Sequence, residues 1–136
     1  MVMPYVDGVV AELLRRAFTG SSPAVTVTTM LPAQSGDRMP LVVARTVGGT
    51  GVRGSHLAQM PTIQIDAYAH TRRDAGVLCE QARAALAAAA RSTMTTTSDG
   101  TLQSLRDVST PAEIREPDQP DRWSRWTCTV RVVVRS

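Results

Sequence analysis

The segment PTIQIDAYAH, residues 61–70, alternates apolar and polar side chains without a break. Successive side chains of a β-strand point to opposite faces, so the pattern predicts a strand with one face toward a core. The apolar face carries Ile63, Ile65, Ala67 and Ala69. Thr71 opens the segment TRRD, where a threonine cap and an acid three residues later predict a helix that runs to about Arg91. A strand that leads directly into an amphipathic helix predicts a fold in which the helix lies on a sheet.

The rest of the chain supplies one more helix and four more strands. Apolar residues at helical spacing predict the helix at 6–18, and β-branched or alternating segments predict strands at 24–31, 41–47, 101–110 and 125–135. Strands that follow one another through short loops pair antiparallel. The chain therefore predicts an α+β fold: a mostly antiparallel sheet of about four or five strands with two helices packed on one face. A length of 136 residues fits a single domain, 1–136.

The segment GTGVRG, residues 49–54, matches the string G-x-G-x-x-G of dinucleotide-binding turns. That turn needs a helix after the glycines, whose free N–H groups hold the pyrophosphate. Here the chain passes through Pro61 into a strand, which favours the tip of a β-hairpin with a long loop at about 48–60. Long loops in small domains are often binding loops. We expect a contact loop that orders against a partner, formed by Gly49, Thr50, Gly51, Val52, Arg53 and Gly54.

A second loop is predicted at about 111–124, where three prolines and several charges favour an exposed segment. Trp123 lies at its end, and two interpretations stay open: an anchor in an interface, or burial inside its own subunit. Trp126 falls on the apolar face of the last predicted strand and is expected in the core.

All fifteen basic residues are arginine, and the net charge is +3. We interpret this first as the coding bias of a GC-rich genome. A nucleic-acid-binding surface is the alternative, but such surfaces cluster their basic residues among aromatics, and here arginines are scattered among acids with 4% aromatic residues. No apolar run reaches the roughly 20 residues of a membrane span, and the first residues lack the pattern of a secretory signal. The expected location is the cytoplasm of the cell that makes the protein.

Candidate catalytic and metal-binding groups are sparse. Neither His56 nor His70 has a second ligand at metal-binding spacing. A trio of Ser55, His70 and Asp66 lacks the elbow motif of a nucleophilic serine. Asp118 and Asp121 fall in the proline-rich loop, where nothing predicts a shifted pKa.

The two cysteines, Cys79 and Cys128, lie far apart in the sequence and on apolar faces, so buried thiols are expected. No cofactor, metal or catalytic residue is predicted, and this favours a structural or interaction protein over an enzyme.

Several segments together resemble a known family. They are VTVTTMLP, MPLVVARTVGG, PTIQIDAYAHTR, CEQARAAL and the final VRVVVR, which span most of the chain. Their order is similar to that of the tail terminator proteins of long-tailed bacteriophages, especially phages of high-GC actinobacterial hosts. Head–tail neck and tail-completion proteins share the same small α+β design and stay open as an alternative; a small nucleic-acid-binding protein is a further one.

The resemblance implies a structural virion protein in the neck region of the tail, assembled in the cytoplasm of the host bacterium. Six copies are expected to form a ring that caps the head-proximal end of the tail tube and stops its polymerisation. The implied partners are other copies of the chain, the major tail tube protein and the head–tail connector or neck protein. DNA passes through the axial channel without sequence-specific binding, no membrane is involved, and no catalytic residue is implied.

A ring subunit needs a separate surface patch for each neighbour. The second face of the predicted sheet is more apolar than solvent exposure explains, and two helices cannot cover both faces. We expect the subunit interface there, formed by Val42, Ala44, Arg45, Tyr68, Arg131, Val133 and Arg135. The arginines would pair with acids of the next subunit, such as those of the 111–124 loop.

Overall fold

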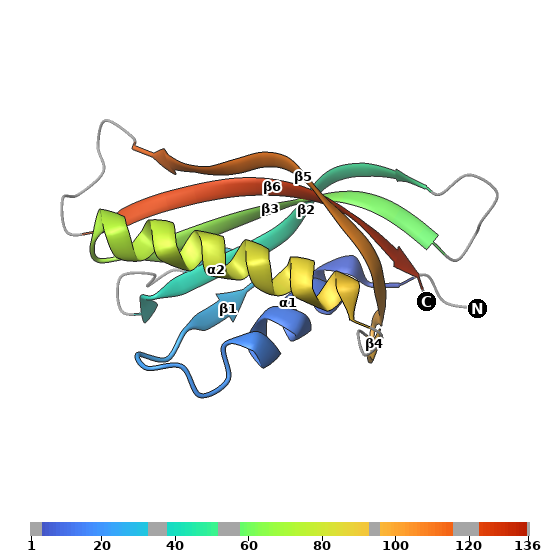
Figure 1. The fold of residues 1–136 in the computed structure, drawn as a ribbon, viewed down its shortest axis with the longest axis horizontal. Helices are drawn as coiled ribbons and strands as arrows, with labels where there is room; N and C mark the ends of the chain where they lie inside the picture. The colour runs from blue at the N-terminus through green and yellow to red at the C-terminus, as the bar shows by residue number, and fades with distance from the viewer. Residues whose placement is uncertain (1–3, 33–37, 52–57, 93–95, 116–122, 136) are drawn as a thin grey trace.

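A computed structural model describes residues 4–32, 38–51, 58–92, 96–115 and 123–135. Two helices and six strands follow one another along the chain (Figure 1). They are α1 (Val6–Ala17), β1 (Thr26–Thr28), β2 (Leu41–Gly51), β3 (Ala58–Ala69), α2 (Arg72–Arg91), β4 (Thr96–Thr97), β5 (Gly100–Ile114) and β6 (Ser124–Arg135). The α+β class is as the sequence predicts.

The six strands form one sheet in the order β1-β2-β3-β6-β5-β4. All neighbours pair antiparallel except β1 and β2, which are parallel. The prediction of four or five strands was therefore too low, because the two-residue β4 carries no recognisable pattern. The antiparallel rule fails between β1 and β2 because residues 29–40 connect them, and a connection of that length can return the chain to the same end of the sheet.

Both helices pack on one face of the sheet, as predicted (Figure 1). Helix α2 begins where the sequence indicates, because the hydroxyl of Thr71 accepts a hydrogen bond from the backbone N–H of Asp74 at 3.1 Å. It ends at Arg91, also as predicted. Helix α1 lies beside α2, across the β1–β2 side of the sheet.

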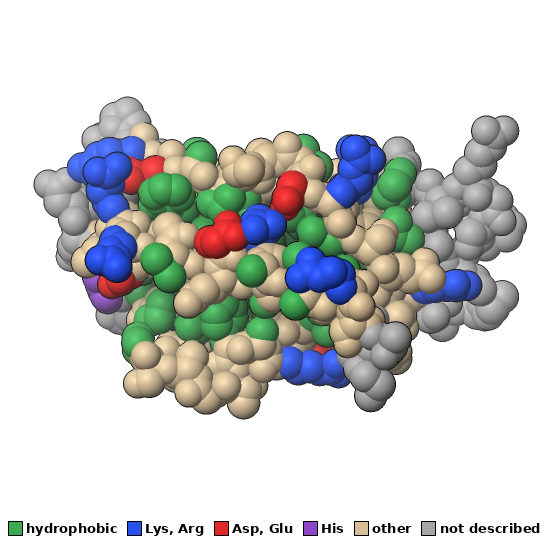
Figure 2. Space-filling model, in the orientation of Figure 1, with side chains coloured by type: hydrophobic (Ala, Val, Ile, Leu, Met, Phe, Trp, Pro, Cys, Tyr) green, Lys and Arg blue, Asp and Glu red, His purple; other side chains and the backbone are tan. Residues whose placement is uncertain are grey.

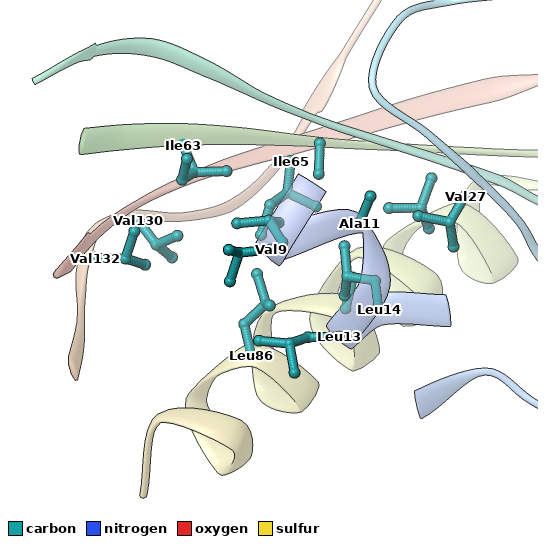
Figure 3. Close-up of a cluster of buried hydrophobic side chains, with 14 of the residues drawn as sticks. Val9, Ala11, Leu13, Leu14, Val27, Ile63, Ile65, Leu86, Val130 and Val132 are labelled. Carbon is teal, nitrogen blue, oxygen red and sulfur yellow. The ribbon is translucent and has the colours of Figure 1, made fainter. Parts of the chain in front are cut away.

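The core lies between the helices and the sheet (Figure 3). Leu14 of α1, Ile65 of β3 and Leu86 of α2 are fully buried in it. Each side chain of this size contributes about 1.5–3 kcal/mol when it leaves water. Trp126 packs against the same cluster, which confirms its expected place.

Val42 and Ala44 belong to this core and are fully buried under the helices. Their predicted place on the second face was wrong. They are paired with Ala67 and Ile65, which lie on the helix-covered face. The first half of β2 is apolar on both faces, so its pattern alone does not show which face is covered.

The glycine segment belongs to the β2–β3 hairpin, as the sequence favours over a nucleotide turn. Gly48, Gly49 and Gly51 are paired with β3 as far as Gln59, and β3 is the next described element, so both strands extend into the predicted 48–60 loop. Gly49 has a φ of 139°, and a Cβ there would lie 2.7 Å from the carbonyl oxygen of Met60. Only glycine fits at this position, where the backbones of the two paired strands lie so close together.

Strand β5 also runs further than predicted. It continues through Pro111 to Ile114, so the start of the predicted 111–124 loop belongs to a strand, and Ser124 at its end belongs to β6. Residues 116–122 are outside the described residues.

Candidate interaction surface

The sheet has a second face that points away from α1 and α2, which we call the open face. Cross-strand pairing fixes which residues lie on it. One row joins Leu41, Tyr68, Arg125 and Ile114; the next joins Val43, Asp66, Thr127 and Ala112; a third joins Arg45, Gln64, Thr129 and Ser109. Further along lie Thr62, Arg131 and Arg106, and then Val133 and Ser104. The open face is therefore apolar at one end and arginine-rich at the other.

The apolar end is covered by the chain itself. Leu41, Val43 and Tyr68 form a small buried cluster, against which Met39 and Trp123 pack. The rings of Tyr68 and Trp123 lie 5.8 Å apart at an angle of 55°. Of the two interpretations of Trp123, the structure supports burial inside its own subunit.

Asp66 lies at the centre of the open face and is only 3% exposed. Its carboxylate accepts a hydrogen bond from Nη2 of Arg125 at 3.3 Å and from Nε2 of Gln64 at 3.0 Å. The guanidinium of Arg125 also lies 5.9 Å from the ring centre of Tyr68. These contacts compensate the burial of the carboxylate.

A pocket of about 260 Å³ opens beside this ion pair. Its walls are Met30, Leu31, Val43, Arg45, Asp66, Tyr68 and Arg125. Met30 and Leu31 are 75% and 54% exposed, which is high for side chains of their size. Methionine and arginine are both enriched in protein interfaces.

The charged side chains of the two layers are arranged differently. On the helix side, Arg83 of α2 joins Glu80 and Asp107, and Arg16 joins Glu12. Figure 2 looks at the helix side and shows acidic side chains next to basic ones there.

On the open face, by contrast, the arginines greatly outnumber the acids. Among the described residues, its only acid is Asp66, and that carboxylate is already bound by Arg125. Within that part of the chain, no ion pair is formed by Arg45, Arg106, Arg131 or Arg135. The open face thus carries cations that form no ion pair with any other described residue.

The structure brings together five of the seven predicted interface residues. Arg45, Arg131, Val133, Arg135 and Tyr68 lie on the open face, although Tyr68 is covered by Trp123. Sequence reasoning missed Leu41, Val43 and Arg106. The alternation of β2 would have identified the two residues of that strand, because Arg45 shares its face with positions 43 and 41 and not with 42 and 44.

The predicted contact loop is described only in part. Gly49, Thr50 and Gly51 form the end of β2. Val52, Arg53 and Gly54 lie outside the described residues, as do Ser55 and His56.

The described residues hold few groups that could carry catalysis. Asp66 and His70 line different pockets, so they do not form a catalytic pair. No cluster of His, Cys, Asp and Glu within the described ranges could hold a metal ion. None of the described helices is long and apolar enough to cross a membrane.

Cys79 and Cys128 are free and buried, as expected from their apolar positions. They come from α2 and β6 and lie side by side in the core. A hydrogen bond with Cys128, together with burial, raises the pKa of the Cys79 thiol above its ordinary value. Cys79 therefore lacks the readily ionised thiolate of a reactive cysteine.

No curated protein matches the sequence. The family described as phage tail termination protein matches residues 2–135, almost the whole chain. The chain belongs to the phage tail termination protein family.

Proposed function

We propose that this protein is a structural component of the phage tail that assembles as a ring, with six copies as the expected number. The ring caps the head-proximal end of the tail tube, stops the addition of tube subunits and presents a docking surface to the head connector. The role is structural and not catalytic. The family match carries this proposal.

Within the ring, we propose that the open face forms part of the contact between neighbouring copies. It is supported by the arginines at 45, 131 and 135, which form no ion pair within the described ranges, and by Val133, which is half-buried on a face without helices. Val42 and Ala44 no longer belong to this surface, and Met30 and Leu31 extend it at the pocket. The end of the β2–β3 hairpin is proposed to reach the tube protein or the channel.

The test is the assembly state of the purified protein, measured by sedimentation and electron microscopy with and without tail tubes. The native chain is expected to form rings, alone or on tube ends. Val133→Glu should abolish rings, since it places a carboxylate in an apolar contact. Val77→Glu is the matched control, because Val77 is 48% exposed on α2, away from the open face.

Circular dichroism should show that both variants keep the native fold. A native protein that stays monomeric even with tube protein would overturn the ring. Rings that bind the head connector but ignore tube ends would instead assign the protein to the neck. If the Val133→Glu variant still forms rings, the proposed function stands, but the open face is not the contact between neighbouring copies.

A further inference from the structure

The two sides of the sheet differ in how their edges are closed. On the β1–β2 side, helix α1 supplies side chains that bind the outer backbone groups. Arg15 donates from Nη2 to the carbonyl of Val27 in β1 at 2.9 Å. The Asp7 carboxylate accepts from the backbone N–H of Thr46 in β2 at 2.8 Å and from its hydroxyl at 2.7 Å. Edge groups satisfied in this way cannot pair with another strand.

Helix α1 also reaches the far end of the sheet, because the sheet curls around it. Arg16 donates to the carbonyl of Thr96 in β4 at 3.2 Å, and the N–H of Tyr5 donates to the carbonyl of Asp99 at 3.1 Å. Strand β4 itself covers β5 only at Gly100 and Thr101. The outer edge of β5 is therefore covered only at its first two residues, Gly100 and Thr101.

The outer edge of β5 beyond that point has no cover. From Gln103 to Ile114, within the described residues, no hydrogen bond from outside the β5–β6 ladder reaches the backbone. The side chains from Arg106 to Thr110 are exposed, and Val108 is 55% exposed. An edge of this length is a template for strand addition unless something interrupts it.

Most of the β5 edge is interrupted. The register shifts between Asp107 and Ser109 and again before Ala112, and Pro111 lacks an N–H to donate. Ser104–Asp107 is the longest run of β5 that pairs with β6 without a shift, and the runs on either side of it, 101–102 and 112–114, are shorter. Among the described residues, Ser104–Asp107 is thus the longest regular part of this edge, and we call it the β5 window.

The charge at this window indicates what can pair with it. Arg106 is directly opposite Arg131 on the open face, and like charges in that position are unfavourable without an anion nearby. Two copies joined edge to edge at β5 would place four arginines on one face of adjacent strands. A continuation of the sheet from β5 of one copy to β1 or β2 of the next meets the groups that Arg15 and Asp7 already occupy.

We propose that the β5 window Ser104–Asp107 is a strand-addition site for an extended, acidic segment of another protein. The added strand pairs its backbone with the outer edge of β5 and places Asp or Glu next to Arg106. Backbone pairing supplies the affinity, and the two arginines supply the preference for acidic segments. The backbone pairing lies on the edge of the sheet, outside the ring contact proposed for the open face, and Arg131 is the residue that the two proposals share.

The probe is an immobilised library of peptides about eight residues long, in which Val or Thr alternates with randomised positions. Peptides retained by the full chain are expected to be enriched in Asp and Glu. Arg106→Glu should weaken a selected peptide by about ten-fold or more and favour peptides with Lys. Arg73→Ala, another exposed arginine but on α2, should bind like the native chain.

Amide hydrogen exchange then locates the bound peptide. Added peptide should slow exchange within Ser104–Asp107 and leave the β1 edge unchanged. Three results would each overturn the proposal: no retained peptide, protection elsewhere, or selected peptides without acids. A dimer of the chain that protects these same amides would show that the β5 edge pairs with a second copy, and it would equally overturn the proposal. None of these results bears on whether Val133 holds the ring together, so the two proposals can fail separately.

Discussion

The guanidinium of Arg125 lies 3.3 Å from the carboxylate of Asp66, on a sheet face that no helix covers. The side chain of Asp66 is only 5% exposed, and that of Arg125 is 21% exposed. Breaking such a pair from one side leaves a buried charge without its counter-ion.

Arg125→Met is therefore expected to lower the free energy of unfolding by about 2–3 kcal/mol. The cause is the carboxylate of Asp66, which stays buried with Gln64 as its remaining donor. Urea denaturation measures the change. Arg106→Met is the matched control and should change stability by less than about 0.5 kcal/mol, because that arginine is exposed. Equal effects of the two substitutions would show that Asp66 does not depend on Arg125.

Gly49 and Gly48 offer a second comparison between adjacent positions. Gly49→Ala should destabilise the protein by at least about 1–2 kcal/mol, because a side chain there combines positive φ with contact against Met60 and Pro61. Gly48→Ala should have little effect, since a Cβ at Gly48 meets nothing within 4 Å. Thermal unfolding of both variants distinguishes them. A tolerated alanine at 49 would mean that the hairpin does not need the close crossing.

The ion pairs around Arg83 predict a pH dependence. A hydrogen bond from Arg83 lowers the pKa of Glu80 below its ordinary value. A carboxyl with a lowered folded-state pKa stabilises the fold above its unfolded pKa, and this contribution is lost as the pH falls through the folded value. The native protein should therefore lose more stability than Arg83→Met between about pH 5 and about pH 3.

At neutral pH, Arg83→Met should cost only about 0.5–1 kcal/mol, since the ion pairs are largely exposed. Urea titrations at a series of pH values test both statements. Parallel pH profiles for the two proteins would contradict the assigned role of Glu80.

The cysteine pair predicts slow thiol chemistry. Cys79 and Cys128 are buried in the native core, and the pKa of Cys79 is raised. A disulfide reagent such as Ellman's should react with the native protein at least about a hundred-fold more slowly than with the protein in guanidinium. Rapid reaction of the native protein would show that α2 separates readily from β6. Cys128→Ala removes the hydrogen bond that raises the pKa of Cys79, so the rate in this variant shows how far burial alone slows that thiol.

The sequence predicts most of the helix layer, because its signals are local. Thr71 and Asp74 mark the start of α2, and the alternation from Ile63 to Ala69 marks the covered face of β3. The place of Val42 and Ala44 was not predictable in the same way, since β2 is apolar on both faces and only the position of Arg45 breaks the tie. The parallel pairing of β1 depends on a connection whose path no local pattern describes.

The surface features were harder to predict than the core. Trp123 covers Tyr68 from a distant part of the sequence, so alternation alone makes Tyr68 look available. The exposed window of β5 results from what β4 and α1 fail to cover, which is a property of the whole sheet. Arg106 had no distinguishing sequence context, and its position opposite Arg131 appears only with the register.

Asp7, Arg15 and Arg16 of α1 bind backbone groups of three strands, β2, β1 and β4 respectively. If α1 were detached, the carbonyl of Val27 and the amide of Thr46 could pair with another strand, and the outer edge of β5 would still be open to pairing as well. A molecule with two receptive margins can add copies of itself without limit. Helix α1 therefore blocks one of the two strand edges through which copies of this chain could join into a continuous sheet.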